Sequence, residues 1–466
     1  MKVPRLDPEK AYIGASLFLP LSKVAEGPVR GALTFGLDRN NEPRVLVKNH
    51  PHHIEVPRAF LTTQQLKEEL EIEVVDLRPK NFPRSSLRPK PGFSLRDRQL
   101  DPWAAYKDAK GGVLHLPCGA GKTIMGLYKA AHEGLSTLIV SPQAAHLDNW
   151  MSELKDHFLL DSTPGRIGDG KMEYDREIVL CTVQTLAMRA EDGQLPIDFA
   201  SRFGTIIFDE THHMSAEFFA RSIDICLGNR YGLTATPKRT DRNEGVFLSH
   251  IGPILYSDDT QEMIPEIEVI ELETELTSAD ERTVSDRSGQ RNLAMLKTWL
   301  AQNTERNDAI RRRLQKAVAE GRTIYALSHS VEHVKALSAM FPGSGLITGE
   351  TPSAERLKEL NKSKIVFATF GVATENYNRK DLDCLFMLTP LAADGYAEAP
   401  QLRQAIGRVQ RAADGKKTPE VIIFLDRNID ECRGLTYSVL NYLKSKNYPF
   451  RNSTWNQKRR NPMVRT

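Results

Sequence analysis

The sequence predicts an α/β protein with two tandem parallel-sheet domains, a small N-terminal α+β domain and a basic C-terminal tail. Short apolar runs alternate with helical segments between residues 93 and 256, and the alternation resumes after a polar stretch at 277–291. Continuous apolar strands separated by helices are typical of a parallel sheet covered on both faces. With 466 residues, the chain is long enough for two or three such domains.

The first domain is predicted from a hairpin pattern and a basic linker. Two apolar segments, 32–37 and 44–48, flank the polar residues 38–42, which is typical of a β-hairpin. Residues 78–98 carry seven lysines or arginines, one aspartate and four prolines, and so predict an extended linker. A soluble tether and a phosphate-contacting segment are both compatible with this composition. The predicted boundaries are 1–92 for the N-terminal domain with its linker, 93–256 and 257–446 for the parallel-sheet domains, and 447–466 for the tail.

A glycine loop lies between a strand and a helix in the first parallel-sheet domain. The apolar run 112–115 precedes it, and a helix that ends near Gly134 follows it. Backbone N–H groups of such a loop and the positive end of the helix dipole converge on an anion, which predicts a phosphate cradle. Lys122 would reach the β- and γ-phosphates, and Thr123 would coordinate Mg²⁺. The predicted nucleotide contacts of the loop are Pro117, Cys118, Gly119, Ala120, Gly121, Lys122 and Thr123.

The general phosphate-loop pattern asks for a glycine five places before Gly121, where this chain has Leu116. Taken alone, the loop is therefore also compatible with a tight strand-to-helix turn that carries a solvated lysine.

An acidic pair follows another apolar strand of the same domain. Asp209 and Glu210 come directly after residues 205–208, at the edge where open α/β sheets bind ligands. Asp209 would hold Mg²⁺ through its water shell, and Glu210 would orient or deprotonate the attacking water. Carboxylates at strand ends also serve as helix N-caps, but a phosphate loop in the same domain favours the functional interpretation.

A helical segment of the second parallel-sheet domain carries polar residues at helical spacing. Gln404, Arg408 and Arg411 lie at i, i+4 and i+7, which predicts one shared helix face. Such a face could close on a γ-phosphate held by the other domain and stabilise the charge of the transition state. Hydrolysis would then require the domains to close, which is the cycle of a motor.

Composition excludes several classes of protein. The five cysteines are scattered without a Cys-x-x-Cys pair, which argues against a zinc ribbon, an iron–sulfur cluster and a disulfide framework. No apolar run approaches the length of a membrane span. We expect a soluble protein of the cytoplasm, or of the host cytoplasm if its source is viral. A net charge of +3 does not by itself indicate a nucleic-acid partner.

Across residues 95–425 the order of motifs resembles that of superfamily 2 helicases. The family's phosphate loop does not require the first glycine, so the resemblance removes the doubt raised by Leu116. The segment 209–212 is similar to a DExH box, with Thr211 where alanine is commoner, and 368–378 is the weakest match. The other matching segments are 95–99, 141–142, 182–186, 234–236 and 404–411.

The resemblance implies two RecA-like domains that use ATP and Mg²⁺. It implies adenine contact by Gln99, a nucleotide contact by Glu375 and catalytic roles for Lys122, Asp209 and Glu210. Gln404, Arg408 and Arg411 would complete the catalytic set. Contacts with the DNA backbone, which carry no sequence preference, are implied for Ser141, Thr182, Gln184, Thr185 and Thr369.

Within the superfamily, the wording of residues 116–123 and 232–239 resembles the XPB-like branch, and the compact size resembles phage UvsW-type helicases. This likeness implies a monomeric 3′-to-5′ DNA motor that acts on forks, displacement loops and Holliday junctions beside replication or recombination proteins. Two alternatives stay open. One is a duplex translocase without strand separation, and the other is a nucleic-acid-binding scaffold whose nucleotide site is not catalytic.

Overall fold

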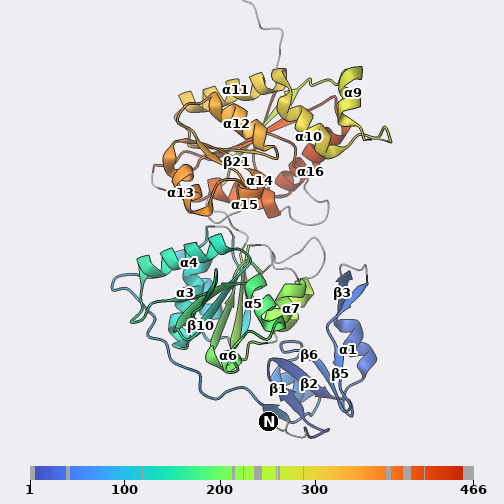
Figure 1. The fold of residues 1–466 in the computed structure, drawn as a ribbon, viewed down its shortest axis with the longest axis vertical. Coiled ribbons are helices and arrows are strands. Elements are labelled where there is room, and N and C mark those ends of the chain that lie inside the picture. The colour runs from blue at the N-terminus through green and yellow to red at the C-terminus, as the bar shows by residue number, and fades with distance from the viewer. Residues whose placement is uncertain are drawn as a thin grey trace, which may run out of the picture. The chain divides into compact units, whose positions relative to one another are not determined.

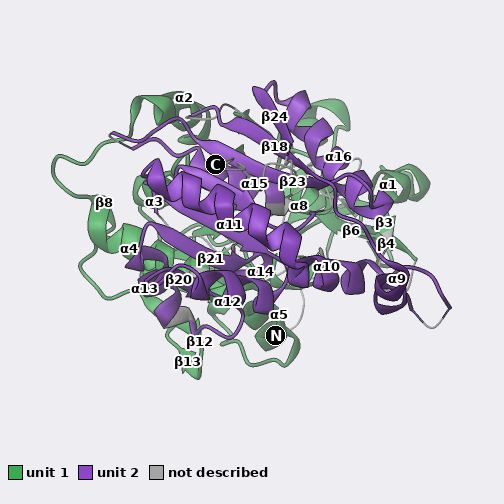
Figure 2. Cartoon of the chain, turned by 90° about the horizontal axis from the view of Figure 1, so that it is seen from above, with its two compact units in different colours: residues 1–259 green, residues 260–466 purple. Residues whose placement is uncertain are grey.

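The computed structural model describes residues 6–37, 42–117, 119–211, 216–223, 225–235, 244–258, 260, 263–286, 288–373, 379–391, 400–413 and 415–454. The chain forms two compact units, residues 1–259 and 260–466, which are coloured separately in Figure 2.

The first unit begins with a five-stranded sheet in the order β5-β6-β2-β1-β7, antiparallel except where β1 lies beside β7. The predicted hairpin is confirmed, because β3 (Thr34–Leu37) pairs antiparallel with β4 (Pro43–Val45). One short α-helix, α1 (Glu26–Ala32), and one π-helix, η1 (Gln65–Glu69), belong to the same region. The strands of the sheet are β1 (Ala11–Ile13), β2 (Ser16–Pro20), β5 (Lys48–Asn49), β6 (His53–Pro57) and β7 (Val74–Asp76).

Two arginines join this N-terminal region to the rest of the unit. The Arg58 guanidinium donates to the carbonyls of Leu227 and Gly228 at 2.8 and 2.6 Å. Arg230 is fully buried and donates to the carbonyls of Ala15 and Cys226 at 2.6 and 2.8 Å. Each charged group thus donates to several backbone carbonyls of the unit.

The basic linker is extended, as predicted, and is docked on the first unit. The carbonyl of Pro83 accepts from the backbone N–H of Ser136 at 2.8 Å, and the backbone N–H of Lys90 donates to the carbonyl of His157 at 2.9 Å. Between them, β8 (Arg88–Pro89) pairs with β11 (Phe158–Leu159).

An eight-stranded sheet forms the body of the first unit, in the order β13-β12-β14-β10-β15-β16-β9-β17, with all pairs parallel except β12 with β13. Alternate residues of β10 face opposite cores, Leu138 and Val140 on one side and Ile139 on the other. Helices α3 and α4 cover the face of Ile139, and α5 and α7 cover the other (Figure 1). The strands are β9 (Gly111–His115), β10 (Thr137–Ser141), β12 (Gly165–Gly168), β13 (Lys171–Met172), β14 (Ile178–Thr182), β15 (Thr205–Phe208), β16 (Asn229–Thr234) and β17 (Ile254–Ser257). The helices are α2 (Asp97–Tyr106), α3 (Lys122–Glu133), α4 (Ala144–His157), α5 (Val183–Glu191), α6 (Phe199–Arg202), α7 (Ala216–Ile223) and α8 (Glu244–Ile251).

A seven-stranded, fully parallel sheet forms the second unit, in the order β20-β21-β19-β22-β23-β18-β24. Tyr325 and Leu327 of β19 face one core, and Ile324 and Ala326 face the other. The strands are β18 (Glu266–Leu272), β19 (Ile324–Ser328), β20 (Gly345–Ile347), β21 (Ile365–Thr369), β22 (Cys384–Met387), β23 (Glu420–Asp426) and β24 (Phe450–Thr454). The helices are α9 (Ser278–Val284), α10 (Leu293–Gln302), α11 (Thr304–Ala319), α12 (Val331–Ala339), α13 (Ser353–Lys362), α14 (Phe370–Ala373), α15 (Pro400–Val409) and α16 (Asp430–Ser445).

The start of the predicted C-terminal tail belongs to this sheet. Residues 450–454 form the edge strand β24, which is parallel to β18. Arg451 lies 2.8 Å from the Glu268 carboxylate, so its charge is used inside the unit. The predicted basic tail therefore contains an edge strand of the sheet at these residues, and residues 455–466 lie outside the described part of the chain.

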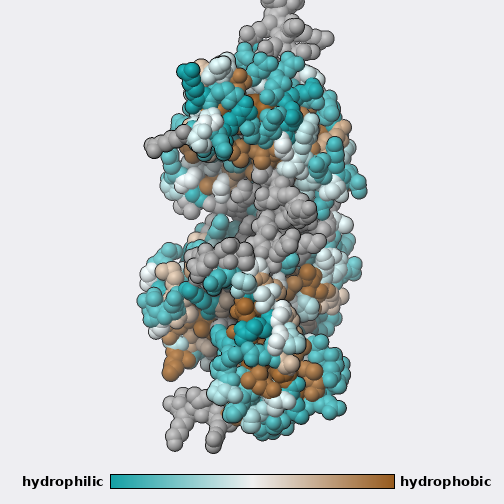
Figure 3. All heavy atoms as spheres, turned by 90° about the vertical axis from the view of Figure 1, so that its right-hand side faces the viewer, coloured by the Kyte–Doolittle hydropathy of each residue, from teal (hydrophilic) through white to brown (hydrophobic). Residues whose placement is uncertain are grey.

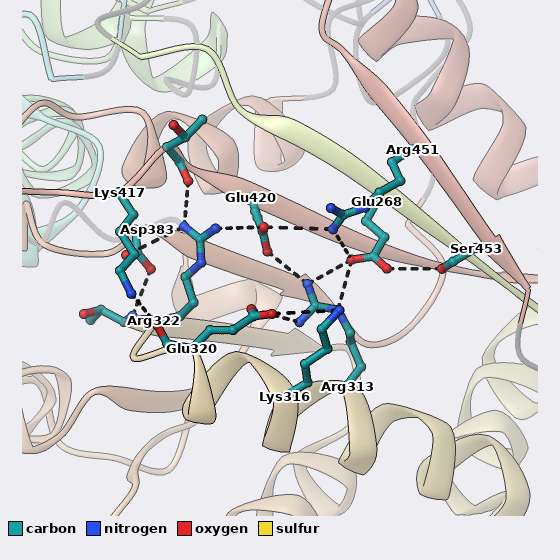
Figure 4. A network of polar contacts seen from close by, with 12 residues as sticks. Glu268, Arg313, Lys316, Glu320, Arg322, Asp383, Lys417, Glu420, Arg451 and Ser453 are labelled. Atoms are coloured by element: carbon teal, nitrogen blue, oxygen red, sulfur yellow. Dashed lines mark hydrogen bonds and ion pairs between the residues drawn. The ribbon is translucent and has the colours of Figure 1, made fainter.

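A network of ion pairs surrounds the same carboxylate (Figure 4). Arg313 of α11 pairs with Glu268 of β18 at 2.8 Å and with Glu420 of β23 at 2.9 Å. Arg322 approaches Glu420 at 2.7 Å from the segment before β19. The network joins α11 to three strands of the sheet.

The surface drawn in Figure 3 is mainly hydrophilic over both units, with hydrophobic patches between the polar regions. Among the described helices, none is both long and apolar enough to cross a membrane.

Candidate functional site

Strand order brings the glycine loop and the acidic pair to one edge of the first parallel sheet. β9 and β15 both lie beside β16, so the loop after His115 and the carboxylates after Phe208 leave neighbouring parts of the sheet. Carboxyl ends of parallel strands share an edge, which is where open α/β sheets bind ligands.

The glycine loop has the backbone shape that a phosphate cradle requires. Gly119 and Gly121 have φ angles of +88° and +83°, a region that other residues rarely adopt. A Cβ placed on Gly121 would also overlap the side-chain amide of Gln99. α3 begins at the next residue and ends at Glu133, with Gly134 as its C-cap, as predicted. Cys118 lies outside the described residues.

Gln99 holds this loop from outside. Its amide nitrogen donates to the carbonyl of Ala120 at 3.0 Å, and its oxygen accepts from the backbone N–H of Arg96 at 3.0 Å. Both ends of the amide therefore bind protein atoms, and adenine contact by Gln99 stays a prediction.

Lys122 is buried at the start of α3, with only 8% of its surface exposed. Its ammonium lies 3.6 Å from Oε1 of Glu210 and donates to the carbonyl of Leu116 at 3.4 Å. This geometry differs from the solvated lysine of the alternative interpretation, and it joins the loop to the acidic pair.

The two carboxylates are buried side by side, each 3% exposed. Burial and the neighbouring charge of Glu210 raise the pKa of Asp209 to about 7. Asp209 accepts a hydrogen bond from the indole N–H of Trp150 at 2.8 Å. Glu210 has a φ angle of +46°, which is strained for a residue with a side chain. Strain of this kind is concentrated at functional sites.

The residues present fit a triphosphate with a divalent cation. The loop supplies a backbone cradle, Lys122 supplies a cation, and Asp209 with the Thr123 hydroxyl supplies the oxygen donors that Mg²⁺ prefers. Two buried carboxylates beside one ammonium also favour a further positive charge. Asn149 donates to Thr123 Oγ1 at 3.3 Å, which orients that hydroxyl.

The sequence alone did not identify Asn149 and Trp150 as part of this site. Both lie in α4, after the segment 141–142 that matches a family motif. A tryptophan in a helix next to a family motif could have identified this contact. A buried indole N–H needs a hydrogen-bond acceptor, which a nearby carboxylate supplies.

A second feature of the first unit is a cavity of about 550 Å³ between the ends of β10, β12 and β14. It is lined by Thr182, Gln184 and Thr185, for which DNA contact stays a prediction. The two threonine hydroxyls are partly used, because Thr182 Oγ1 caps α5 and lies 2.8 Å from Thr185 Oγ1. The other lining residues are Pro142, Gln143, Ala144, Leu147, Arg166, Ile167, Gly168 and Asp169.

Ser141, a predicted backbone contact, does not line this cavity. It is fully buried, and its hydroxyl lies 3.1 Å from Nδ1 of His146. The second unit repeats this arrangement, with Ser328 at the end of β19 and Nδ1 of His333 at 3.0 Å. In both units the hydroxyl fixes the turn from strand to helix.

The predicted residues of the second unit are placed as follows. Thr369 ends β21, and Gln404 and Arg408 lie in α15, where the Arg408 guanidinium is 5.8 Å from the ring centre of Tyr325. α15 ends at Val409, so Arg411 lies in the following turn and the predicted shared helix face is wrong for it. Glu375 lies outside the described residues.

Comparison with known proteins gives the following likenesses. The family model described as "Type III restriction enzyme, res subunit" matches residues 61–239. "Probable helicase D10" of Escherichia phage T5 is 26% identical over 348 residues, which is 72% of each chain. "DNA 3'-5' translocase XPB2" of Sulfurisphaera tokodaii is 32% identical over 201 residues, which is 42% of each chain. The chain thus spans less than half of the length of the archaeal relative.

Among solved structures, "ATP-dependent Type ISP restriction-modification enzyme LlaBIII bound to DNA" matches 84% of this chain and 34% of its own. The TM-score is 0.53 and the sequence identity is 15%, so this match concerns the fold alone. The two tandem RecA-like parallel-sheet domains are thereby confirmed. The resemblance to superfamily 2 helicases of the XPB-like and phage types is also confirmed.

Proposed function

We propose that the chain is an ATP-driven DNA helicase or translocase that remodels branched DNA. The observation that carries the proposal is the buried cluster of Lys122, Asp209 and Glu210 beside a glycine loop. The similarity to a phage helicase and to an archaeal DNA translocase supports the motor activity and the choice of DNA. The proposed preference for forks and junctions rests on the sequences of the motifs alone.

Each residue of the cluster has a proposed task. ATP with Mg²⁺ would supply a phosphoanhydride bond whose hydrolysis releases free energy. Lys122 would offset phosphate charge, and Thr123 with Asp209 would hold the cation. Glu210 orients the attacking water and accepts its proton. Catalytic roles of Gln404, Arg408 and Arg411, and nucleotide contacts by Gln99 and Glu375, belong to the proposal.

The cavity of the first unit is the proposed place for the DNA backbone. Thr182, Gln184 and Thr185 offer hydroxyl, amide and backbone groups that suit phosphate oxygens without reading bases. Thr369 is the proposed contact in the second unit, and the N-terminal domain with its basic linker is proposed to bind duplex arms.

Phosphate release with and without forked DNA tests the catalytic part. We expect Lys122→Ala and Glu210→Gln to lower turnover by about 100-fold or more. Glu210→Gln should still bind ATP, because the amide keeps the shape of the carboxylate. The control is Lys110→Ala, which removes an exposed lysine of the same unit. A wild-type chain without DNA-stimulated turnover would favour the non-catalytic scaffold.

A duplex translocase without strand separation is the second candidate. The match of residues 61–239 to a restriction-enzyme subunit family favours it. Displacement of an oligonucleotide from forked DNA supports the helicase, whereas displacement of a triplex strand from blunt duplex alone supports the translocase.

A further inference from the structure

Three consecutive residues of α4 contact the two features of the first unit. Asp148 Oδ1 accepts from Arg166 Nη1 at 3.2 Å, and Arg166 lines the cavity. Asn149 donates to Thr123, and Trp150 donates to Asp209. Successive side chains of a helix are turned by about 100°, so a single turn can reach different neighbours.

The contact at Trp150 leaves little freedom of movement. The indole is fully buried, and it packs against the helix that follows the glycine loop. A Cβ placed on Gly126 of α3 would lie 2.5 Å from the indole Cη2 atom. α3 and α4 therefore cannot slide past one another without moving the indole, and with it the donor to Asp209.

At the end of α4 that lines the cavity, Arg166 can exchange its ion-pair partners. Ala144 and Leu147 line the cavity from the first turns of this helix. Arg166 is about one third exposed, and its partners Asp148 and Asp169 are more exposed still. Solvated pairs of this kind are weak, so a phosphate in the cavity can replace Asp148 as the partner of Arg166.

We infer that α4 couples the cavity to the nucleotide site, with Asn149 and Trp150 as the positioning residues that hold Thr123 and Asp209. This inference rests on the proposed function, because it assigns the means by which DNA stimulates hydrolysis. A DNA backbone phosphate bound beside Arg166 shifts the first turns of α4. The rigid packing of the indole carries the shift to the two oxygen donors of the cation.

The test compares Trp150→Phe and Asn149→Ala with the wild-type chain. Trp150→Phe keeps a buried ring and removes the N–H donor, and Asn149→Ala removes the donor to Thr123. Trp103→Phe is the matched control, because this indole packs on Tyr128 and His132. The measurements are turnover at saturating ATP without and with saturating forked DNA, and the DNA concentration that gives half-maximal stimulation.

We expect the stimulation by DNA to fall by about fivefold or more in both variants, since couplings between sites are typically of this size. The half-saturating DNA concentration should change by less than about twofold, because neither residue lines the cavity, and Trp103→Phe should match the wild type. A merely structural role would lower basal and stimulated turnover together and leave their ratio unchanged.

If DNA stimulates the wild type and the variants keep the same ratio of stimulated to basal turnover, the inference is overturned and the proposed function stays intact. A wild type that DNA does not stimulate overturns the proposed function instead. Thermal unfolding of each variant checks the fold, and Asn149→Ala decides alone if Trp150→Phe does not fold.

Discussion

Gly121 shows how much a single residue without a side chain contributes to the glycine loop. Its positive φ angle starts α3, and the absence of a Cβ leaves room for the Gln99 amide that holds the loop. Backbone shape and local packing thus depend on the same position. Gly134, at the other end of α3, has a φ angle of +58°, but a Cβ placed on it would meet no atom of the described residues within 4 Å.

These two glycines form a matched pair of variants. Gly134→Ala should lower the free energy of unfolding by about 1 kcal/mol, the usual cost of a left-handed alanine. Gly121→Ala should cost more and should also abolish ATP binding, because the new methyl group displaces Gln99 and distorts the loop. Denaturant unfolding and nucleotide titration measure both effects. Equal losses in the two variants, with ATP binding retained, would contradict this account.

At the scale of elements, the ion-pair network of the second unit divides into a buried and an exposed part. Arg313 is buried between Glu268 and Glu420, whereas about half of the Arg451 side chain is exposed. Burial would raise the pKa of Glu268, but the hydrogen bond from Arg451 and the charge of Arg313 outweigh it and lower that pKa. This stabilisation is therefore present above the unfolded pKa of 4.5 and is lost as the pH falls through the lower folded value.

Arg313→Met should lower the free energy of unfolding by about 3 kcal/mol at pH 7, because two buried carboxylates lose a shared partner. Arg451→Met should cost about 1 kcal/mol at most, and less in high salt. Denaturant unfolding at low and high salt distinguishes the two. The ranking would be refuted by a larger loss in Arg451→Met.

Elements with strong local patterns could be predicted from the sequence. The apolar runs at 137–140, 178–181 and 205–208 are strands, because buried parallel strands are apolar on both faces. β24 could not be predicted in this way. Its residues, Phe450–Thr454, are mostly polar, and a distant carboxylate on β18 rather than a local pattern holds them in the sheet.

The sequence predicted which residues form the candidate site, but not the contacts between them. The sequence identified Lys122, Asp209 and Glu210, whose motifs are local. It could not show that Ser141 faces inward, because burial depends on the helix packed over β10. The sequence also did not show that α15 ends at Val409, two residues before Arg411, because the ends of a helix are its least clearly marked part.

At the scale of the whole molecule, the N-terminal region is an integral part of the first unit. The buried guanidinium of Arg230 donates to the carbonyl of Ala15, and Phe35 belongs to hydrophobic clusters of both sheets. Removal of residues 1–92 would uncover these groups, so such a deletion would test folding as well as DNA binding.

A point variant separates the two effects more cleanly. Arg58→Met should lower the stability of the first unit by about 2 to 4 kcal/mol, because charged hydrogen bonds to several buried carbonyls are lost. The control, Arg78→Met, breaks the pair with Asp76 inside the N-terminal sheet region and should cost about 0.5 kcal/mol. Thermal unfolding together with protease cleavage of the N-terminal region measures both. Similar losses of stability in both variants would show that Arg58 does not hold the N-terminal region to the rest of the unit.

The indole of Trp150 has a further use, because it is a fluorophore that is hydrogen-bonded to Asp209 in the buried cluster of Lys122, Asp209 and Glu210. The chain contains four tryptophans, at positions 103, 150, 299 and 455, so emission from this one can be isolated by replacing the rest. The protein thereby carries its own optical label at the place where the chemistry is proposed, and no dye has to be attached.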